Sequence, residues 1–242
     1  MTNATRDGIL TDRIALFAAS LSCVVALHCA RPEQSSREEP APREAHVAKE
    51  ESTRNEAPST RIIGGGCDGC EAIYEGMPET VSPRTAIASE SEPGERLEIS
   101  GTVYQRDGKT PAPGVILYLH QTDTTGHYTP APGATGLTAR DGHLRGWLKS
   151  GERGEYSFTT IRPAPYPNAT IPAHIHVTVK EPGKNEYYID DFLFDDDPLL
   201  VERERARLEN RAGSGIITLT RRNGILTATR DIILGMNIPD YD

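Results

Sequence analysis

The stretch Ile171-Pro-Ala-His-Ile-His-Val-Thr-Val179 alternates polar and apolar residues, many of them β-branched, as a half-buried β-strand does. Side chains of a strand alternate between its two faces, so we expect His174 and His176 to point the same way, opposite to Ile175 and Val177. A rigid strand can therefore direct two imidazole nitrogens at one metal ion. Because a lone His-x-His pair is more often a surface or hydrogen-bonded pair, the residues around it must carry the assignment.

Two tyrosines upstream complete a candidate metal site. Tyr128 lies in Gly126-His-Tyr-Thr-Pro130, and Tyr166 lies in Arg162-Pro-Ala-Pro-Tyr-Pro167. Phenolate oxygen is a hard anionic donor, and together with imidazole it suits iron, Fe(III) more than Fe(II). Tyrosines beside glycine and proline also pack over turns in many proteins. The whole set nevertheless predicts a mononuclear iron site with four ligands: Tyr128, Tyr166, His174 and His176.

The surrounding sequence resembles the intradiol ring-cleavage dioxygenases, the superfamily of protocatechuate 3,4-dioxygenase and catechol 1,2-dioxygenase. The most specific likeness is Gly154-Glu-Tyr-Ser-Phe-Thr-Thr-Ile-Arg-Pro-Ala-Pro-Tyr-Pro167, followed by Pro172-Ala-His-Ile-His176. The segments Gly101–Tyr104, Pro113–His120 and Tyr188–Pro198 resemble neighbouring strands of that family. The resemblance covers about residues 97–234.

The resemblance implies an enzyme that cleaves a catechol-type ring with O2 between the two hydroxyl-bearing carbons and gives a muconate-type diacid. It implies Fe(III) as cofactor, with Tyr128 and His174 as equatorial ligands and Tyr166 and His176 as axial ligands. It also implies that Tyr166 leaves the iron when catechol binds and accepts a substrate proton. Tyr166 and Tyr128 are therefore the expected catalytic residues. No nicotinamide or flavin motif is needed for this chemistry.

One residue departs from the family pattern. The family usually carries arginine immediately before Pro-Ala-His-Ile-His, where it is thought to stabilise negative charge on the ring, and here that position is Ile171. Arg162 and Arg145 are candidates to replace this cation. The change predicts a substrate without a carboxylate, such as catechol or an alkylcatechol rather than a benzoate.

Two other functions stay open at this stage. The first is a non-catalytic β-sandwich module that binds a ligand or a metal and derives from the same fold; the loss of the arginine favours it. The second is an Fe(II) oxygenase that uses His174, His176 and an aspartate from the group Asp190, Asp191 and Asp195–Asp197. His120, His127 and His143 read as loop or strand histidines, and Trp147 is expected in or near the loop that leads to Tyr166.

The remaining pattern predicts an all-β fold, an antiparallel β-sandwich that forms a single catalytic domain. Asp107-Gly108 and Asn223-Gly224 are typical of hairpin turns. One surface helix is expected over residues 198–211, where leucines and a valine mix with many charges. The expected strands cover residues 97–104, 114–121, 155–161, 174–180, 187–194, 216–220 and 225–233.

The N-terminal part predicts export. Residues 1–30 contain a short apolar run typical of a signal peptide or lipoprotein signal, with Cys23 or Cys29 as the residue that would be lipidated. Residues 31–62 read as a disordered linker, and residues 63–242 as the dioxygenase-like domain. The expected location is periplasmic, membrane-anchored through lipid, or secreted.

Charge and cysteine content limit the partners. The formal net charge of −9 argues against nucleic-acid binding, so a catechol-type small molecule and O2 are the expected partners. Edge strands of a sandwich also leave a homo-oligomer open. Cys67 and Cys70 form a C-x2-C pair that predicts a disulfide in an exported protein, with a two-residue metal clip as the alternative.

Overall fold

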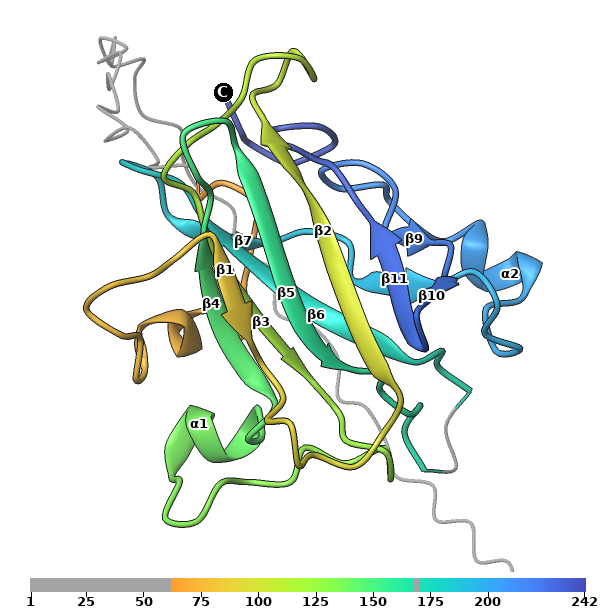
Figure 1. Ribbon diagram of the computed structural model, residues 1–242. Helices are drawn as coiled ribbons and strands as arrows, with labels where there is room; N and C mark the ends of the chain where they lie inside the picture. The colour runs from red at the N-terminus through yellow and green to blue at the C-terminus, as the bar shows by residue number, and fades with distance from the viewer. Residues whose placement is uncertain (1–61, 168–169) are drawn as a thin grey trace, which may run out of the picture. The chain divides into compact units, whose positions relative to one another are not determined.

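Two β-sheets pack face to face in the computed structural model, which describes residues 62–167 and 170–242 (Figure 1). The first sheet has the order β1 (Arg84–Ala86), β5 (Glu155–Ile161), β2 (Arg96–Tyr104), β11 (Ile225–Thr229) and β10 (Thr220–Arg222), with β12 (Ile232–Ile233) also on β2. The second has the order β4 (Arg145–Lys149), β3 (Ile116–Gln121), β6 (His174–Lys180), β8 (Phe192–Phe194) and β9 (Ile216–Ile217), with β7 (Glu186–Tyr188) also on β6.

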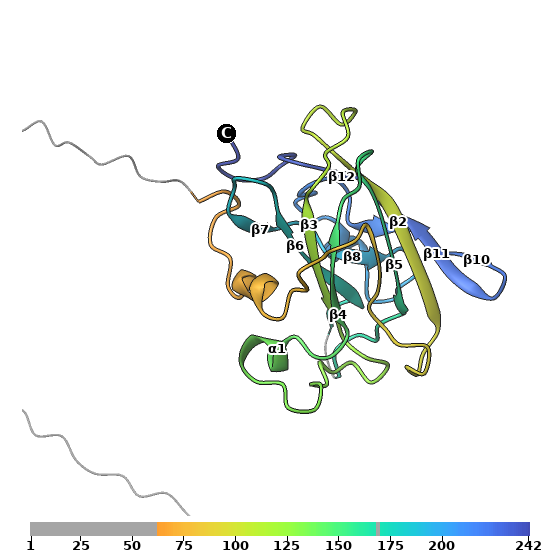
Figure 2. The same ribbon diagram turned by 60° about the vertical axis from the view of Figure 1, so that its left-hand side comes forward.

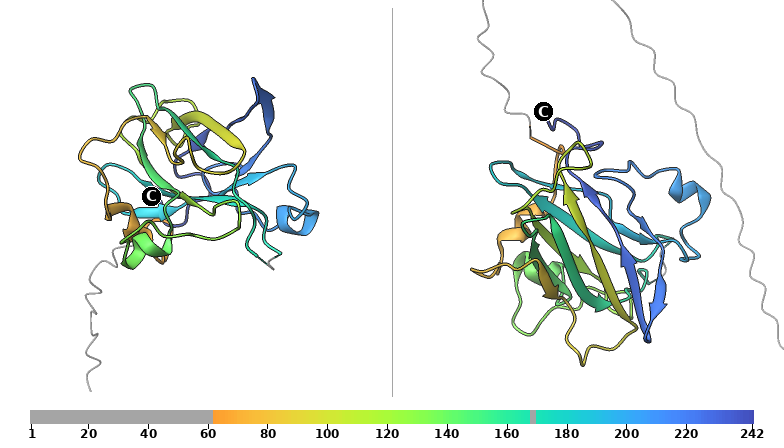
Figure 3. Two further views of the ribbon diagram at one scale, coloured as in Figure 1. Left: turned by 60° about the horizontal axis from the view of Figure 1, so that its bottom comes forward. Right: turned by 45° about the horizontal axis from the view of Figure 1, so that its top comes forward.

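Three short helices accompany the sheets: a 3-10 helix η1 (Cys70–Tyr74), α1 (Gly136–Arg140) and α2 (Glu202–Arg205). In the views of Figures 1 and 3, η1 and α1 lie on one side of the sheets and α2 lies on the other. The predicted all-β sandwich is therefore confirmed, and both sheets are mixed in direction. The pairs β2·β5, β3·β4 and β3·β6 are antiparallel, whereas β1·β5, β2·β11, β2·β12 and β8·β9 are parallel.

Several element boundaries differ from the prediction. The expected helix over residues 198–211 contracts to the four residues of α2, because its apolar residues cluster at one end and form no stripe that could pack. The strand expected over 187–194 divides into β7 and β8, and that over 225–233 breaks at Arg230 between β11 and β12. Trp147 lies in strand β4, and the strands expected from the sequence do not include this one.

The space between the sheets is filled by one face of each strand. On β6, Ile175, Val177 and Val179 are fully buried in this core, as the alternating pattern predicts. Phe158 of β5 and Phe192 of β8 meet there edge to face, with ring centroids 5.7 Å apart. This apolar layer fixes which side chains of β6 face outward, because a strand cannot turn one residue without turning its neighbours.

The outer face of the second sheet carries a separate cluster that η1 covers (Figure 2). Ala72 and Ile73 of η1 pack against Tyr118 of β3, and the Trp147 indole donates a hydrogen bond to the Ile73 carbonyl at 2.7 Å. The disulfide between Cys67 and Cys70 closes the turn that enters η1, which confirms the predicted pairing.

The N-terminal predictions lie almost wholly outside the described residues. This applies to the signal peptide or lipoprotein signal of residues 1–30, including Cys23 and Cys29, and to the linker of residues 31–62 up to its last residue. Between residues 62 and 242, apart from the two undescribed positions, no helix is long and apolar enough to cross a membrane.

Replacement of Phe158 by alanine tests the packing between the sheets. We expect Phe158→Ala to lower the free energy of unfolding by about 3–5 kcal/mol, because it leaves a cavity opposite Phe192, and Phe158→Leu to cost less. Urea unfolding followed by fluorescence measures both. An unfolding midpoint equal to that of the unchanged protein in the alanine variant would contradict the packing.

Candidate metal centre

The outward side chains of β6 meet two loops at one end of the sandwich. Strand β6 starts at His174 and pairs with the end of β3, so that His176 lies opposite His120 in the antiparallel register. Tyr128 follows β3 in the chain, and Tyr166 follows β5 of the other sheet. The two expected histidines and the two expected tyrosines, far apart in the sequence, therefore come together.

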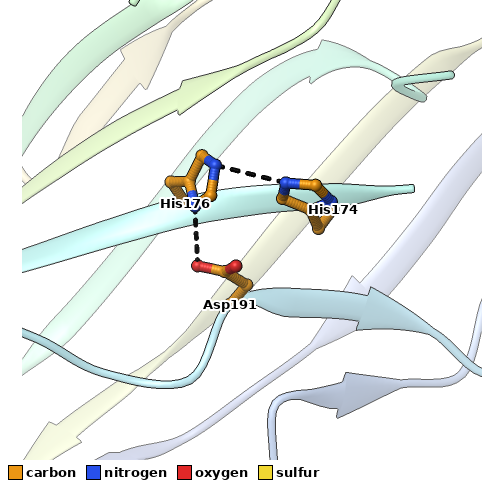
Figure 4. A group of neighbouring side chains, drawn as sticks. All are labelled: His174, His176 and Asp191. Atoms are coloured by element: carbon orange, nitrogen blue, oxygen red, sulfur yellow. Dashed lines mark hydrogen bonds and ion pairs between the residues drawn. The ribbon is translucent and has the colours of Figure 1, made fainter. Parts of the chain in front are cut away.

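The polar atoms of these four side chains converge on one point. The hydroxyls of Tyr128 and Tyr166 are 2.8 Å apart, and the Tyr166 hydroxyl lies 3.0 Å from His174 Nε2 and 3.5 Å from His176 Nε2. The two Nε2 atoms are 3.2 Å apart (Figure 4). The structure thus brings together all four residues that the sequence predicts as ligands.

The outer nitrogen of each histidine has its own acceptor. His174 Nδ1 donates to the carbonyl of Pro172 at 2.7 Å, and His176 Nδ1 lies 3.0 Å from the Asp191 carboxylate. An acceptor at Nδ1 favours the tautomer with the proton on that atom, which leaves the Nε2 lone pair free. Both free lone pairs then point into the cluster.

A carboxylate shapes the loop that presents Tyr128. Asp123 accepts hydrogen bonds from the backbone N–H groups of Thr125 and His127 and from the hydroxyls of Thr125 and Thr129. Burial acts to raise the pKa of Asp123, but these bonds outweigh it and hold the pKa at about 2. The carboxylate is therefore ionised at neutral pH and fixes the turn immediately before and after Tyr128.

The loops of the two tyrosines are tied to each other. The Ala164 N–H donates to the Asp123 carbonyl at 3.2 Å. Gly126 has φ +80° and packs so closely on the Pro165 carbonyl that a Cβ atom there would lie 2.2 Å from the oxygen. Only glycine fits this contact, which places Tyr166 next to Tyr128.

Burial sets the protonation of the ligands in the absence of a metal. It raises the pKa of Tyr128, as does its hydrogen bond to Tyr166, and it raises the pKa of Tyr166. Burial and the neighbouring His176 lower the pKa of His174. For His176, burial acts to lower the pKa, but the Asp191 carboxylate outweighs it and the pKa lies above its ordinary value. A bound cation would stabilise both phenolates and so reverse the effect of burial on the tyrosines.

The donor set fits a single iron ion. Donors that each lie about 2.0–2.1 Å from one ion are roughly 3 Å apart, and the distances that link the four polar atoms here are 2.8–3.5 Å. Two phenol oxygens and two imidazole nitrogens are the mixture of hard and intermediate donors that suits ferric iron. Tyr128, Tyr166, His174 and His176 could therefore hold it.

A group of two histidines and a carboxylate also lies here. His174, His176 and Asp191 each offer a ligand atom within 4.8 Å of the others. However, Asp191 lies at Nδ1 of His176, whereas His174 lies at Nε2 of the same ring (Figure 4), as does the Tyr166 hydroxyl. One imidazole cannot direct both nitrogens at one ion, so the tyrosine-containing set is the better formed of the two.

Two clefts reach the cluster, one of about 680 Å³ and one of about 350 Å³. Tyr166, His176 and Asp191 line both. The larger cleft extends along His120 and Tyr128 toward Asp68, next to the disulfide. The smaller cleft is more apolar, and its further lining residues include Ile171, Pro172, Leu193, Leu200 and Leu208.

The two arginines considered as substitutes for the missing family arginine lie elsewhere. Arg162 forms a two-pronged ion pair with Asp196, with nitrogen–oxygen distances of 2.8 and 2.9 Å. Arg145 lies over the Trp147 ring at 5.1 Å. Neither arginine lines a cleft beside the cluster, and the expectation that Trp147 lies near the Tyr166 loop is wrong.

The site also contains a histidine whose position the sequence did not reveal. The His120 ring lies 4.6 Å from the His176 ring and 5.8 Å from the Tyr128 ring. Burial and the neighbouring His176 lower the pKa of His120 to about 3, so that its ring is neutral at ordinary pH. His120 is brought there by the register between β3 and β6, and a single sequence does not show this register.

The fold is a β-sandwich, and its tyrosine–histidine cluster could hold a single metal ion. A family model described as "Dioxygenase" matches residues 74–208, more than half of the chain. The chain belongs to this dioxygenase family, which confirms the resemblance to the intradiol enzymes.

Two curated proteins with similar sequences are ring-cleaving 1,2-dioxygenases by name. A 6-chlorohydroxyquinol 1,2-dioxygenase of Cupriavidus pinatubonensis is 36% identical over 106 residues, with 37% of each chain covered. A chlorocatechol 1,2-dioxygenase of Rhodococcus opacus is 30% identical over 147 residues, which cover 52% of this chain and 54% of that protein. The chain thus spans about half or less of the length of these curated relatives.

A solved structure shows the same fold. Catechol 1,2-dioxygenase from Acinetobacter sp. ADP1, inhibited by bound mercury, superposes with a TM-score of 0.51 at 22% identity. The match covers 65% of this chain and 58% of that chain. At this level of identity the likeness concerns the fold alone.

A histidine outside the cluster anchors the loop after Tyr128. His143 Nδ1 donates to the Thr129 carbonyl at 2.7 Å, and Nε2 lies 3.0 Å from the Glu92 carboxylate. Burial acts to lower the pKa of His143, but the Thr129 carbonyl and Glu92 outweigh it and raise the pKa above the ordinary value of 6.5. The stabilisation is therefore fully present below pH 6.5 and is lost as the pH rises through the folded-state pKa.

The His143 contact predicts a pH-dependent loss of stability. We expect His143→Gln to lower the melting temperature relative to the unchanged protein at pH 6, and to lower it by much less at pH 9. Thermal unfolding of both proteins at the two pH values measures the difference. A difference in melting temperature that does not change with pH would contradict the ionic contribution of Glu92.

Proposed function

We propose that this protein is an Fe(III)-dependent intradiol dioxygenase that cleaves a catechol-type ring with O2 between its two hydroxyl-bearing carbons and gives a muconate-type diacid. The observation that carries this proposal is the convergence of Tyr128, Tyr166, His174 and His176, with both Nε2 lone pairs turned inward. Ferric iron held by these residues would supply a Lewis acid that binds the catechol oxygens and makes the ring reactive toward O2. The same convergence does not favour a non-catalytic module.

Tyr166 is the ligand best placed to move. Its hydroxyl lies within 3.5 Å of the Tyr128 hydroxyl and of Nε2 of both histidines. Its side chain lines both clefts, whereas Tyr128 lines only the larger one. Tyr128 sits in the turn held by Asp123, while Tyr166 lies in a proline-rich segment outside any strand. A Tyr166 side chain that is held as the phenolate and swings into a cleft would accept a catechol proton at its oxygen and become the neutral phenol, the positioned general-base role.

The clefts also favour a substrate without a carboxylate. Three arginines line the larger cleft, and each lies near a carboxylate: Arg140 is 3.2 Å from Asp141, Arg207 is 3.1 Å from Glu204, and Arg211 is 4.0 Å from Glu209. Ile171, which occupies the position of the family arginine, is half-exposed in the more apolar cleft. Among the described residues that line the two clefts, every arginine thus already has a carboxylate neighbour, which disfavours an anionic ring substituent.

Iron loading tests the ligand set. The purified protein loaded with ferric iron should be red-brown from tyrosinate-to-iron charge transfer, and this band should shift when catechol is added without O2. We expect Tyr166→Phe to change the band and to reduce catechol turnover about 100-fold or more, because it removes both a ligand and a base. Tyr104→Phe, on a strand of the other sheet, is the matched control. A protein that stays colourless after ferric loading would rule out the proposal.

Substrate preference tests whether the clefts favour a catechol without a carboxylate. We expect kcat/KM for catechol to exceed that for protocatechuate by at least about tenfold, because the benzoate carboxylate would meet no unpaired cation. Ile171→Arg should narrow this ratio by raising the rate with protocatechuate. Steady-state oxygen consumption with each substrate gives the two kcat/KM values and hence their ratio. Comparable turnover of the two catechols by the unchanged protein would contradict the preference.

A further inference from the structure

The two ligand histidines differ in what holds their outer nitrogen. His174 donates to a neutral acceptor, the backbone carbonyl of Pro172. His176 instead faces a carboxylate, with Nδ1 3.0 Å from Asp191 Oδ1. Figure 4 shows Asp191 on the side of the His176 ring that is turned away from His174. The carboxylate therefore lies behind the ligand and not among the four donors.

The backbone that carries Asp191 is fixed independently of any metal. The neighbouring Asp190 carboxylate accepts hydrogen bonds from the N–H groups of Asn210 and Arg211 at 2.9 and 3.1 Å. A Cβ atom at Gly215 would lie 2.3 Å from the Asp191 carbonyl, so the chain after α2 packs directly on this segment. These contacts place the carboxylate behind His176 before an ion arrives.

A buried cation lies next to the same segment. Arg230 donates from Nη1 to the Asp190 carbonyl at 2.7 Å, and its guanidinium lies 4.6 Å from the Phe192 ring centroid. Its side chain is buried, and Nε and Nη2 have no hydrogen-bond partner in the described part of the chain. Burial raises the pKa of Asp190, and the positive charge of Arg230 acts in the opposite direction.

We propose that Asp191 is a positioning residue for the metal centre. It holds the proton of His176 on Nδ1, keeps Nε2 directed at Tyr166 and His174, and makes this imidazole a stronger donor than His174. This inference rests on the proposed function. A carboxylate behind a ligand histidine fixes the ring and increases its basicity, and loss of such a partner usually costs 10–100-fold in metal affinity. The added electron density should also stabilise ferric over ferrous iron.

Two substitutions separate the hydrogen bond from the charge. Asp191→Asn keeps the shape and an oxygen that can accept from Nδ1, but it removes the negative charge. Asp191→Ala removes both. Asp196→Asn is the matched control, because it removes the same charge from an exposed side chain that pairs with Arg162, which lines neither cleft.

The iron-loaded proteins should differ in three measured properties. We expect Asp191→Ala to bind ferric iron roughly 10–100-fold more weakly than the unchanged protein, and Asp191→Asn to lie between the two. In both variants the tyrosinate-to-iron band should move to longer wavelength and the reduction potential should rise, because the iron becomes poorer in electrons. Asp196→Asn should match the unchanged protein. Unchanged affinity, band and potential in both Asp191 variants would overturn the proposal.

A metal-free measurement keeps the inference separate from the proposed function. Nitrogen-15 NMR of the metal-free protein locates the ring proton of His176, which we expect on Nδ1 in the unchanged protein and redistributed toward Nε2 in Asp191→Ala. If the unchanged protein never becomes coloured with iron, the proposed function fails, and this spectrum alone decides the role of Asp191. A proton that stays on Nδ1 without Asp191 would overturn it. If the alanine variant does not fold, the band and potential of Asp191→Asn decide in its place.

Discussion

The burial of alternate residues of β6 is the constraint on which the site depends. Ile175, Val177 and Val179 fill the core between the sheets, so His174 and His176 must both face outward. A shift of one residue would bury the imidazoles and expose the apolar side chains, which the hydrophobic effect opposes. The histidine pair is thus positioned by its neighbours, and the loops only have to bring two tyrosines to a fixed place.

Those loops are fixed by local polar contacts and not by a hydrophobic core. Asp123 orders the turn around Tyr128, and the close approach of Gly126 to Pro165 joins this turn to the Tyr166 segment. Tyr166 lines both clefts, whereas Tyr128 lines only the larger one. The two tyrosines and the two histidines therefore meet where both clefts reach the end of β6.

The sequence was informative where chemistry follows local pattern. The period-two alternation of β6 predicts that both imidazoles share a face. The family motifs predict the four ligands, which the structure brings together, and the sandwich, which is confirmed. The sequence could not predict contacts between strands, because the register of a strand pair depends on packing. The position of His120 opposite His176 is an example. The helix expected over residues 198–211 failed for a related reason, since a few apolar residues among charges do not show whether a stripe will find a partner.

Because the cluster lies on the outer face of the second sheet, the residues that form it differ from those that hold the two sheets together. The apolar residues that hold the sheets together lie on one side of β6, and the donors lie on the other. Substitutions among the donors can therefore accumulate with little effect on whether the chain folds, and core substitutions can be screened without touching the chemistry. In this architecture the side chains that could hold a metal can change while the apolar face that joins the two sheets stays the same.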